Sequence, residues 1–311
     1  MDELRDRPSL RALSIGEIFD RAVTMYVRHF AVFSLIVLTL LVPFGIIQFF
    51  MSDSSSNSMT QLIQQMEHPG RTISPYSSAQ LTAFVLLGLV VLVLTPFANN
   101  AVAVGVAAIY AGRQPSYRDG FARVLRRAGP LLGSILLCGL ILLGAYLGIV
   151  IAVMLVAMMA ALIWQAAPFM GVVFVVIGIA MFLAVLLLFM LLVMCAAFAL
   201  YATTLEDARP ADAIGEAFRR IFNRRELGKA TLISIAYLAI QFGAALISIA
   251  VAMLVLSLAH SAVVQIVIST AISAAVTAFA TILLAVYYYD VRTRSEGLDL
   301  EVDLERLTAP I

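Results

Sequence analysis

The sequence predicts an all-α, polytopic membrane protein with six transmembrane helices, and three observations support this prediction. Hydrophobic residues make up 62% of the 311 positions, charged residues only 13%, and the mean hydropathy is +1.01. Soluble domains carry about a quarter charged residues, so composition alone indicates a membrane protein. The apolar residues also form six charge-free blocks, each long enough for the roughly 20 residues that cross the hydrocarbon core. The blocks are Phe30–Met51, Leu81–Ala111, Pro130–Ile163, Pro168–Thr204, Ala230–Leu258 and Ala262–Tyr289.

The placement of basic residues is the third observation, and it predicts the orientation. If the six helices alternate in direction, 19 of the 20 Lys/Arg residues lie on one side and Arg71 alone lies on the other. Because positive residues stay on the cytoplasmic side, we expect both termini in the cytoplasm. The 19 arginines against one lysine are typical of a GC-rich bacterial genome, so the expected location is the bacterial inner (cytoplasmic) membrane.

The expected domain organisation follows from this topology. Residues 1–29 form a cytoplasmic N-terminus with an amphipathic helix, 30–290 a six-span membrane domain, and 291–311 a cytoplasmic tail. Within the membrane domain, 52–80 is a Ser-rich external loop, and 112–129 and 205–229 hold cytoplasmic amphipathic helices.

A short pattern, [DE]-x-F-x-R, precedes the first, third and fifth blocks as "EIFDR" (17–21), "DGFAR" (119–123) and "EAFRR" (216–220). The acid and the arginine are four residues apart, the favourable order for a helical ion pair, and the phenylalanine points the other way. Ser14 and Glu17 form a capping box that marks the start of the first of these helices. Each pattern therefore predicts an arginine-faced helix that lies on anionic lipid. The candidate lipid-contact residues are Arg21, Arg28, Arg123, Arg126, Arg127, Arg219, Arg220 and Arg224.

The third of these helices is expected to start at Pro210 and Asp212, without a capping box. Its polar face would carry Glu216 together with Arg219, Arg220 and Arg224. Its predicted apolar face consists of Ile214, Phe218, Ile221 and Phe222.

Each surface helix precedes two spans, so the chain reads as three repeats of a surface helix plus two spans. Tyr110, Tyr201 and Tyr287–Tyr289 follow the same scheme, since they mark the interfacial end of the second span in each repeat. The alternative is that the three matches are coincidental, because any interfacial helix uses Arg and Phe.

None of the six blocks contains Asp, Glu, Lys, Arg or His, which argues against a proton- or voltage-driven device. The polar exceptions include Asn99 and Asn100, which lie beyond Pro96. They are expected to fill the hydrogen-bonding gap that a proline leaves or to bond a neighbouring span; the alternative is that they line a groove. Small and hydroxyl residues at helical spacing predict packing seams or, alternatively, a polar pathway. They are Gly144, Gly148, Ser269, Ser273, Thr277 and Thr281.

Catalytic and metal signals are weak to absent. The sequence contains no GxxxxGK, HExxH or GxSxG element. His68, His260 and Glu67 would share one side but lack the spacing of a metal site. Cys138 and Cys195 lie inside apolar blocks and are interpreted as buried thiols. We expect no catalytic residue, no metal, no cofactor and no nucleic-acid partner.

Three stretches, "LSIGEIFDRAVTMYVRHF" (13–30), "LEDARPADAIGEAFRR" (205–220) and "YYYDVRTRSEGLDLE" (287–301), resemble the bacterial glycerophosphoryl diester phosphodiesterase membrane-domain family. That family is a six-span module, attached in some relatives to a soluble catalytic barrel. The His-Arg-Gly element of the barrel is not found here, so the resemblance implies architecture and membrane location but no catalytic residue.

These observations together favour a non-enzymatic inner-membrane protein that acts as a membrane-partner module or an accessory subunit of a larger complex. Its expected partners are anionic membrane lipids and other membrane proteins or further copies of itself. The alternative is a lipid or amphiphile carrier with a groove between the repeats.

Overall fold

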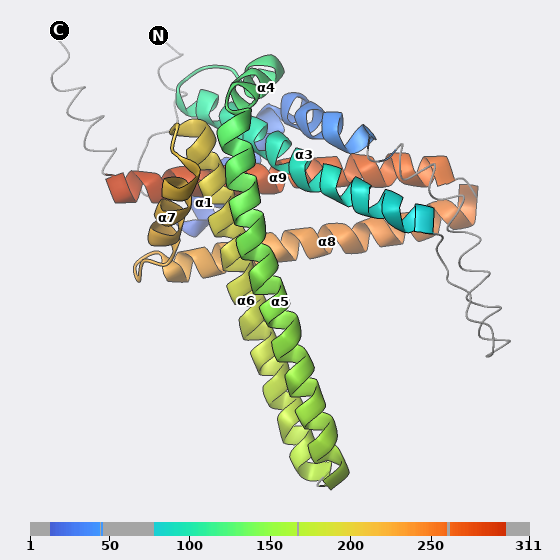
Figure 1. Ribbon diagram of the computed structural model, residues 1–311. Coiled ribbons are helices and arrows are strands. Elements are labelled where there is room, and N and C mark those ends of the chain that lie inside the picture. The colour runs from blue at the N-terminus through green and yellow to red at the C-terminus, as the bar shows by residue number, and fades with distance from the viewer. Residues whose placement is uncertain (1–12, 44, 46–77, 167, 260–261, 297–311) are drawn as a thin grey trace. The chain divides into compact units, whose positions relative to one another are not determined.

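The computed structural model describes residues 13–43, 45, 78–166, 168–259 and 262–296, and all regular secondary structure in these ranges is helical (Figure 1). The helices are α1 (Ile15–Arg28), a following helix Phe30–Pro43, α3 (Ser78–Tyr110), α4 (Tyr117–Arg126), α5 (Ala128–Ala166), α6 (Pro168–Leu205), α7 (Pro210–Ile221), α8 (Leu227–Ala259) and α9 (Ala262–Glu296). The predicted all-α class is therefore confirmed.

Five of the described helices are long and apolar enough to cross a membrane, or up to six if each bent helix pair counts as one span. The five candidate spans are Gly88–Tyr110, Ala128–Ala161, Val172–Leu205, Leu227–Val255 and Val263–Ser295, and each overlaps a predicted block. The first predicted block is described from Phe30 to Pro43; most of its remainder and residues 52–77 of the predicted external loop lie outside the described residues. α1 and the helix Phe30–Pro43 meet at a bend of 83°, so a sharp break separates the amphipathic helix from the apolar one.

The described chain divides into two compact units. Unit 1 comprises residues 20–124 and 240–283, apart from the gaps already given, and unit 2 comprises residues 13–19, 125–239 and 284–296. The start of α1, the start of α8 and the end of α9 thus belong to unit 2, although these segments are distant in sequence.

Local sequence signals explain where several helices begin and end. The backbone N–H of Ser14 donates to Glu17 Oε2 (2.7 Å) and the N–H of Glu17 donates to Ser14 Oγ (3.3 Å), which confirms the predicted capping box. α7 begins at Pro210 without a side-chain cap, also as predicted. α3 ends in a turn at Gly112, whose φ of 70° favours glycine.

Unit 1 holds the predicted proline–asparagine feature of α3. Asn100 Nδ2 donates to the carbonyl oxygen of Pro96 (2.8 Å), and Thr281 Oγ1 of α9 donates to Asn99 Oδ1 (3.2 Å). One asparagine therefore bonds within its own helix near the proline, and the other bonds a neighbouring helix. α4 lies close to α3, since a Cβ added at Gly120 would be 3.1 Å from the carbonyl oxygen of Ala101.

Unit 2 is built on the hairpin of α5 and α6, which run side by side, with α7 packed against both (Figure 1). A buried hydrogen bond of 2.8 Å joins Ser134 Oγ and Thr203 Oγ1 across the two helices. The core of this unit is aromatic. The ring of Phe198 lies 5.5 Å from that of Tyr287 and 5.1 Å from that of Tyr288, and Tyr201 lies 5.7 Å from Tyr288.

Three of the tyrosines that were predicted to mark the interfacial ends of spans are buried within unit 2. Tyr201, Tyr287 and Tyr288 are each at most 2% exposed, because they pack on Phe198 and on one another. α9 also continues to Glu296, so residues 291–296 of the predicted tail are helical.

Candidate functional site

The end of α9 carries a group of charged residues that is arranged by helical spacing. Tyr287, Asp290 and Arg294 share one face of the helix, because they are three and then four residues apart. Tyr288 and Arg292, four residues apart, share another face. Each face meets a different set of ionic partners within unit 2.

We call the first set the Glu206 cluster: Glu206, Glu216, Arg220, Tyr288 and Arg292. Arg220 binds both carboxylate oxygens of Glu206, at 3.1 and 3.2 Å, and also donates to Glu216 Oε2 at 2.8 Å. Tyr288 donates its hydroxyl to Glu206, and Arg292 Nε lies 3.4 Å from Glu206 Oε1. The side chains of Arg220 and Glu206 are only 6% and 13% exposed, so this two-pronged pair is shielded from water.

Burial and pairing act against each other at this carboxylate. Burial by itself raises the pKa of Glu206, but the hydrogen bonds from Arg220 and Tyr288 and the charges of Arg220 and Arg292 outweigh it and lower the pKa. Burial likewise works to lower the pKa of Arg220, and Glu206, Tyr288 and Glu216 together raise it. Both groups are therefore held in their charged forms.

The second set, the Asp290 cluster, consists of Leu13, Glu226, Lys229, Asp290 and Arg294. Lys229 Nζ lies 2.5 Å from Asp290 Oδ2, Arg294 Nε lies 3.2 Å from the same oxygen, and the backbone N–H of Leu13 donates to Asp290 Oδ1 at 2.6 Å. Lys229 and Arg294 also both donate to the carbonyl oxygen of Leu13, each at 2.6 Å. The cluster thus ties the segment before α1 to the start of α8 and the end of α9.

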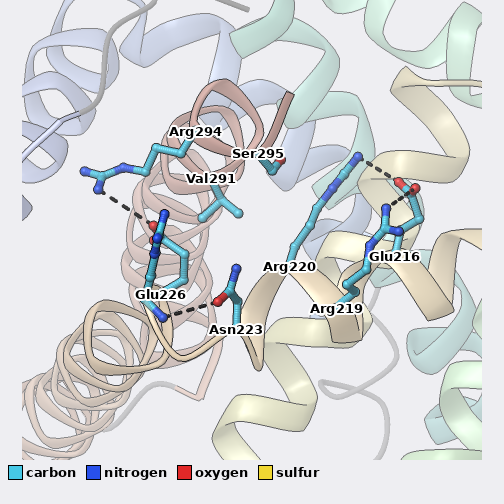
Figure 2. A pocket seen from close by; sticks show the side chains of 9 residues that line it. Glu216, Arg219, Arg220, Asn223, Glu226, Val291, Arg294 and Ser295 are labelled. Carbon is cyan, nitrogen blue, oxygen red and sulfur yellow. Dashed lines mark hydrogen bonds and ion pairs between the residues drawn. The ribbon is translucent and has the colours of Figure 1, made fainter. Parts of the chain in front are cut away.

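A pocket of about 720 Å³ lies beside these clusters. Figure 2 shows its walls: α7 supplies Glu216, Arg219 and Arg220, and α9 supplies Arg294 with its neighbours. The lining residues are Glu216, Arg219, Arg220, Asn223, Arg225, Glu226, Val291, Arg294 and Ser295. Arginines of three segments thus line one space.

The structure agrees with the predicted apolar face of α7 in part. Ile221 is buried and Ile214 and Phe218 are half-buried, but the buried residues also include Ala213, Ala217 and Arg220, and Arg220 was expected on the polar face. Arg220 lies inside because Glu206 binds it there, whereas Phe222 is 38% exposed. Arg219 and Arg224 are exposed, as a role at the surface requires.

The other predicted lipid-contact arginines are divided between open and partly covered positions. Arg28, Arg123 and Arg126 are exposed. Arg21 lies over the ring of Tyr110 in unit 1, with its guanidinium carbon 5.9 Å from the ring centre. Arg127 pairs with Asp207 in unit 2 at 2.5 Å.

The small and hydroxyl residues also have mixed surroundings. A Cβ added at Gly144 or Gly148 of α5 would meet no atom within 4 Å, so neither glycine serves a close contact between described residues. In α9, the hydroxyls of Ser269 and Thr281 donate to carbonyl oxygens of their own helix. Ser273 is exposed and Thr277 is half-buried.

Several members of the two clusters were missed by the sequence analysis, above all Glu206, Lys229, Asp290 and the backbone of Leu13. Their partners lie as many as 281 residues apart, and a single sequence does not reveal such pairing. One signal was available: Lys229 is the only lysine in the chain, and Asp290 follows three tyrosines directly.

The arrangement can hold an anion. Glu206 and Asp290 are paired with cationic side chains, and the pocket lining includes four arginines, whose guanidinium groups bind oxyanions. Within the described residues no three His, Cys, Asp or Glu side chains gather as metal ligands would. His68 and Glu67, considered as ligands, lie outside those residues, and so does His260. Cys138 and Cys195 are free and buried, as predicted.

Fold and site together define an all-helical, polytopic membrane protein with an arginine-lined pocket at the ends of its helices. The chain belongs to a family described as a domain of unknown function, DUF8558, whose model matches residues 1–294. No curated protein and no solved structure matches the chain.

Proposed function

We propose that this protein is a non-enzymatic component of the bacterial inner membrane, with both termini in the cytoplasm. In this proposal it acts as a membrane-partner module or an accessory subunit of a larger membrane complex. Its partner is another membrane protein or a second copy of the chain, and it binds through contacts between spans.

The observation that carries this proposal is the open glycine pair of α5. Gly144 and Gly148 have the GxxxG spacing that lets two helix backbones approach closely in lipid. No described residue covers this face, and α5 meets α6 elsewhere, at the contact of Val156 with Gly178. Exposed apolar side chains surround the pair, including Leu143, Leu147 and Ile151, and they offer a ridge for a partner helix.

The paired charges of unit 2 support a role other than catalysis. Glu206 and Asp290 each bind at least two cationic side chains, so they hold helices together rather than standing ready as a general acid or base. The carrier alternative needs a polar groove near Asn99, Asn100 and the Ser/Thr residues. The hydrogen bonds of Asn99 to Thr281 and of Asn100 to Pro96 support packing instead.

Two further proposals concern ancestry. We propose that the chain is related to the glycerophosphoryl diester phosphodiesterase membrane-domain family, on the basis of the three resembling stretches. We also propose that it consists of three repeats of a surface helix and two spans, and the bend of 83° after α1 supports this pattern for the first repeat.

The test of the function is the double variant Gly144→Ile/Gly148→Ile. Because a Cβ at either position has open space, the variant should fold, but its bulk should keep a partner helix away. We expect wild-type protein to form a crosslinked product of defined mass in native membranes and the double variant to lose it. Gly88→Ile, at another open glycine, is the matched control and should keep the product. A wild-type protein that yields no adduct, or a double variant that keeps it, would contradict the proposal.

A further inference from the structure

The pocket of unit 2 has an excess of positive charge. Its lining holds four arginines, Arg219, Arg220, Arg225 and Arg294, against two acids, Glu216 and Glu226, which leaves two positive charges. Adding the rest of both clusters does not change the balance, because Lys229 and Arg292 offset Glu206 and Asp290. A cavity with this charge attracts anions.

Arginine donors remain available at the open side of the pocket. Arg219 is 78% exposed and reaches Glu216 through Nη2 alone (3.0 Å), so the rest of its guanidinium fork is open for an oxyanion. Arg225, in the segment between α7 and α8, is exposed and also lines the pocket. Two guanidinium groups from adjoining segments suit the spread of oxygens on a phosphate.

Glu226, which also lines the pocket, has a carboxylate oxygen that lacks a hydrogen-bond donor among the described residues. The residue is 8% exposed, and its Oε2 is buried without a hydrogen-bond partner among the described residues. Its other oxygen lies 3.7 Å from Arg294 Nη1, beyond hydrogen-bond distance. A buried acceptor of this kind is costly unless a donor reaches it. Because Glu226 lines the pocket, a turn of its carboxylate toward the cavity would let a ligand hydroxyl supply that donor.

The position of the pocket points to the source of the ligand. The candidate span Leu227–Val255 begins directly after Glu226, and the candidate span Val263–Ser295 ends at Ser295, which lines the pocket. Phospholipid head groups lie where apolar spans end, and basic pockets between helix ends bind anionic head groups.

We propose that this pocket binds the head group of an anionic phospholipid, with phosphate oxygens at Arg219 and Arg225 and a head-group hydroxyl donating to Glu226 Oε2. This site is separate from the glycine face of α5, so the two proposals can fail independently. Free inorganic phosphate has the same oxyanion chemistry, so it is the alternative ligand for the two arginines.

Calorimetric titration of the detergent-purified full chain tests the proposal with four probes. They are dihexanoyl phosphatidylglycerol, the hydroxyl-free dihexanoyl phosphatidylmethanol, zwitterionic dihexanoyl phosphatidylcholine and inorganic phosphate. We expect phosphatidylglycerol to bind at least about tenfold more tightly than phosphatidylcholine. Phosphatidylcholine carries the same phosphate, but its quaternary ammonium is repelled by the excess positive charge of the pocket and it has no hydroxyl for Glu226. The affinity for phosphatidylmethanol should lie between those for the other two lipids, because this lipid carries the net negative charge but lacks the hydroxyl that would donate to Glu226.

The double variant Arg219→Gln/Arg225→Gln should weaken phosphatidylglycerol binding about tenfold. The matched control is Arg113→Gln/Arg209→Gln, which removes the same charge from exposed positions outside the pocket and the predicted lipid contacts, and it should leave affinity within about twofold. Circular dichroism checks that both variants fold. Equal binding of all three lipids, or equal losses in the two variants, would overturn the site. Inorganic phosphate that binds as tightly as phosphatidylglycerol would overturn the lipid as its source.

Discussion

Glu206 and Asp290 organise unit 2 at the scale of single residues, because each gathers cations from separate segments of the chain. Removing one partner of a buried ion pair leaves an uncompensated charge, which costs more than the pair itself contributes. Surface pairs such as Arg219–Glu216, with side chains 78% and 39% exposed, contribute little because water screens them.

Glu206→Gln tests this contrast. The variant keeps the shape of the side chain but removes the buried negative charge that Arg220 and Arg292 share, so the free energy of unfolding should fall by about 3 kcal/mol. Thermal unfolding in mild detergent, followed by circular dichroism, measures the effect. The control is Glu216→Gln, at a more exposed partner of Arg220, where the loss should be about 1 kcal/mol or less. Equal losses in the two variants would show that burial of the Glu206 pair does not matter.

The lowered pKa of Glu206 predicts how stability depends on pH. A carboxylate whose pKa is lowered in the folded state stabilises the fold fully at pH values above its ordinary pKa of 4.5. This stabilisation is lost as the pH falls through the folded-state pKa. Arg220, whose pKa is raised, stays charged throughout that range. The unfolding temperature of the wild type should therefore drop below about pH 4.5, and that of Glu206→Gln should drop less. Parallel pH curves for the two proteins would refute this explanation.

At the scale of elements, the short amphipathic helices α1, α4 and α7 combine a local pattern with contacts that the pattern does not contain. The capping box of α1 and the proline start of α7 were predicted because they depend on neighbouring residues. The buried face of α7 was predicted in part: Ile221 is buried as expected, but Glu206, outside the helix, draws Arg220 inward. Hydrophobic periodicity assumes that arginine faces water, and a buried counter-charge reverses that preference.

Two glycines in these helices should respond oppositely to the same change. Gly16→Ala in α1 meets open space, so the gain in helix propensity should stabilise the protein by about 0.5–1 kcal/mol. Gly120→Ala in α4 makes the same gain but brings its Cβ within 3.1 Å of the backbone oxygen of Ala101, so stability should not rise and should fall by up to about 2 kcal/mol. Unfolding temperatures of the two variants decide this. A clear rise for Gly120→Ala would mean that α4 does not lie close to α3.

At the scale of the whole molecule, the spans were predictable and the pocket was not. Apolar blocks and their lengths follow from composition along the chain, and the five described spans overlap the predicted ones. The Asn99–Thr281 contact was foreseen only as one of two options, because its partner helix is 182 residues away. The Asp290 cluster joins segments up to 281 residues apart, so only the fold could reveal it.

The proposed membrane orientation depends on the distribution of charge along the chain. The helix ends that carry the two clusters belong to segments rich in Lys and Arg, which the charge rule assigns to the cytoplasm. The proposed lipid site depends on this orientation, since the negative surface potential belongs to the cytoplasmic leaflet.

Cysteine labelling in intact cells tests the orientation most directly. In a background with Cys138→Ala and Cys195→Ala, single cysteines are placed at Ser55, which lies outside the described residues, and at Ser116 and Ser295. A membrane-impermeant maleimide should label Ser55→Cys and should leave Ser116→Cys and Ser295→Cys unlabelled until the membrane is opened. Labelling of Ser116→Cys or Ser295→Cys in intact cells would contradict the proposed topology and the cytoplasmic position of the pocket.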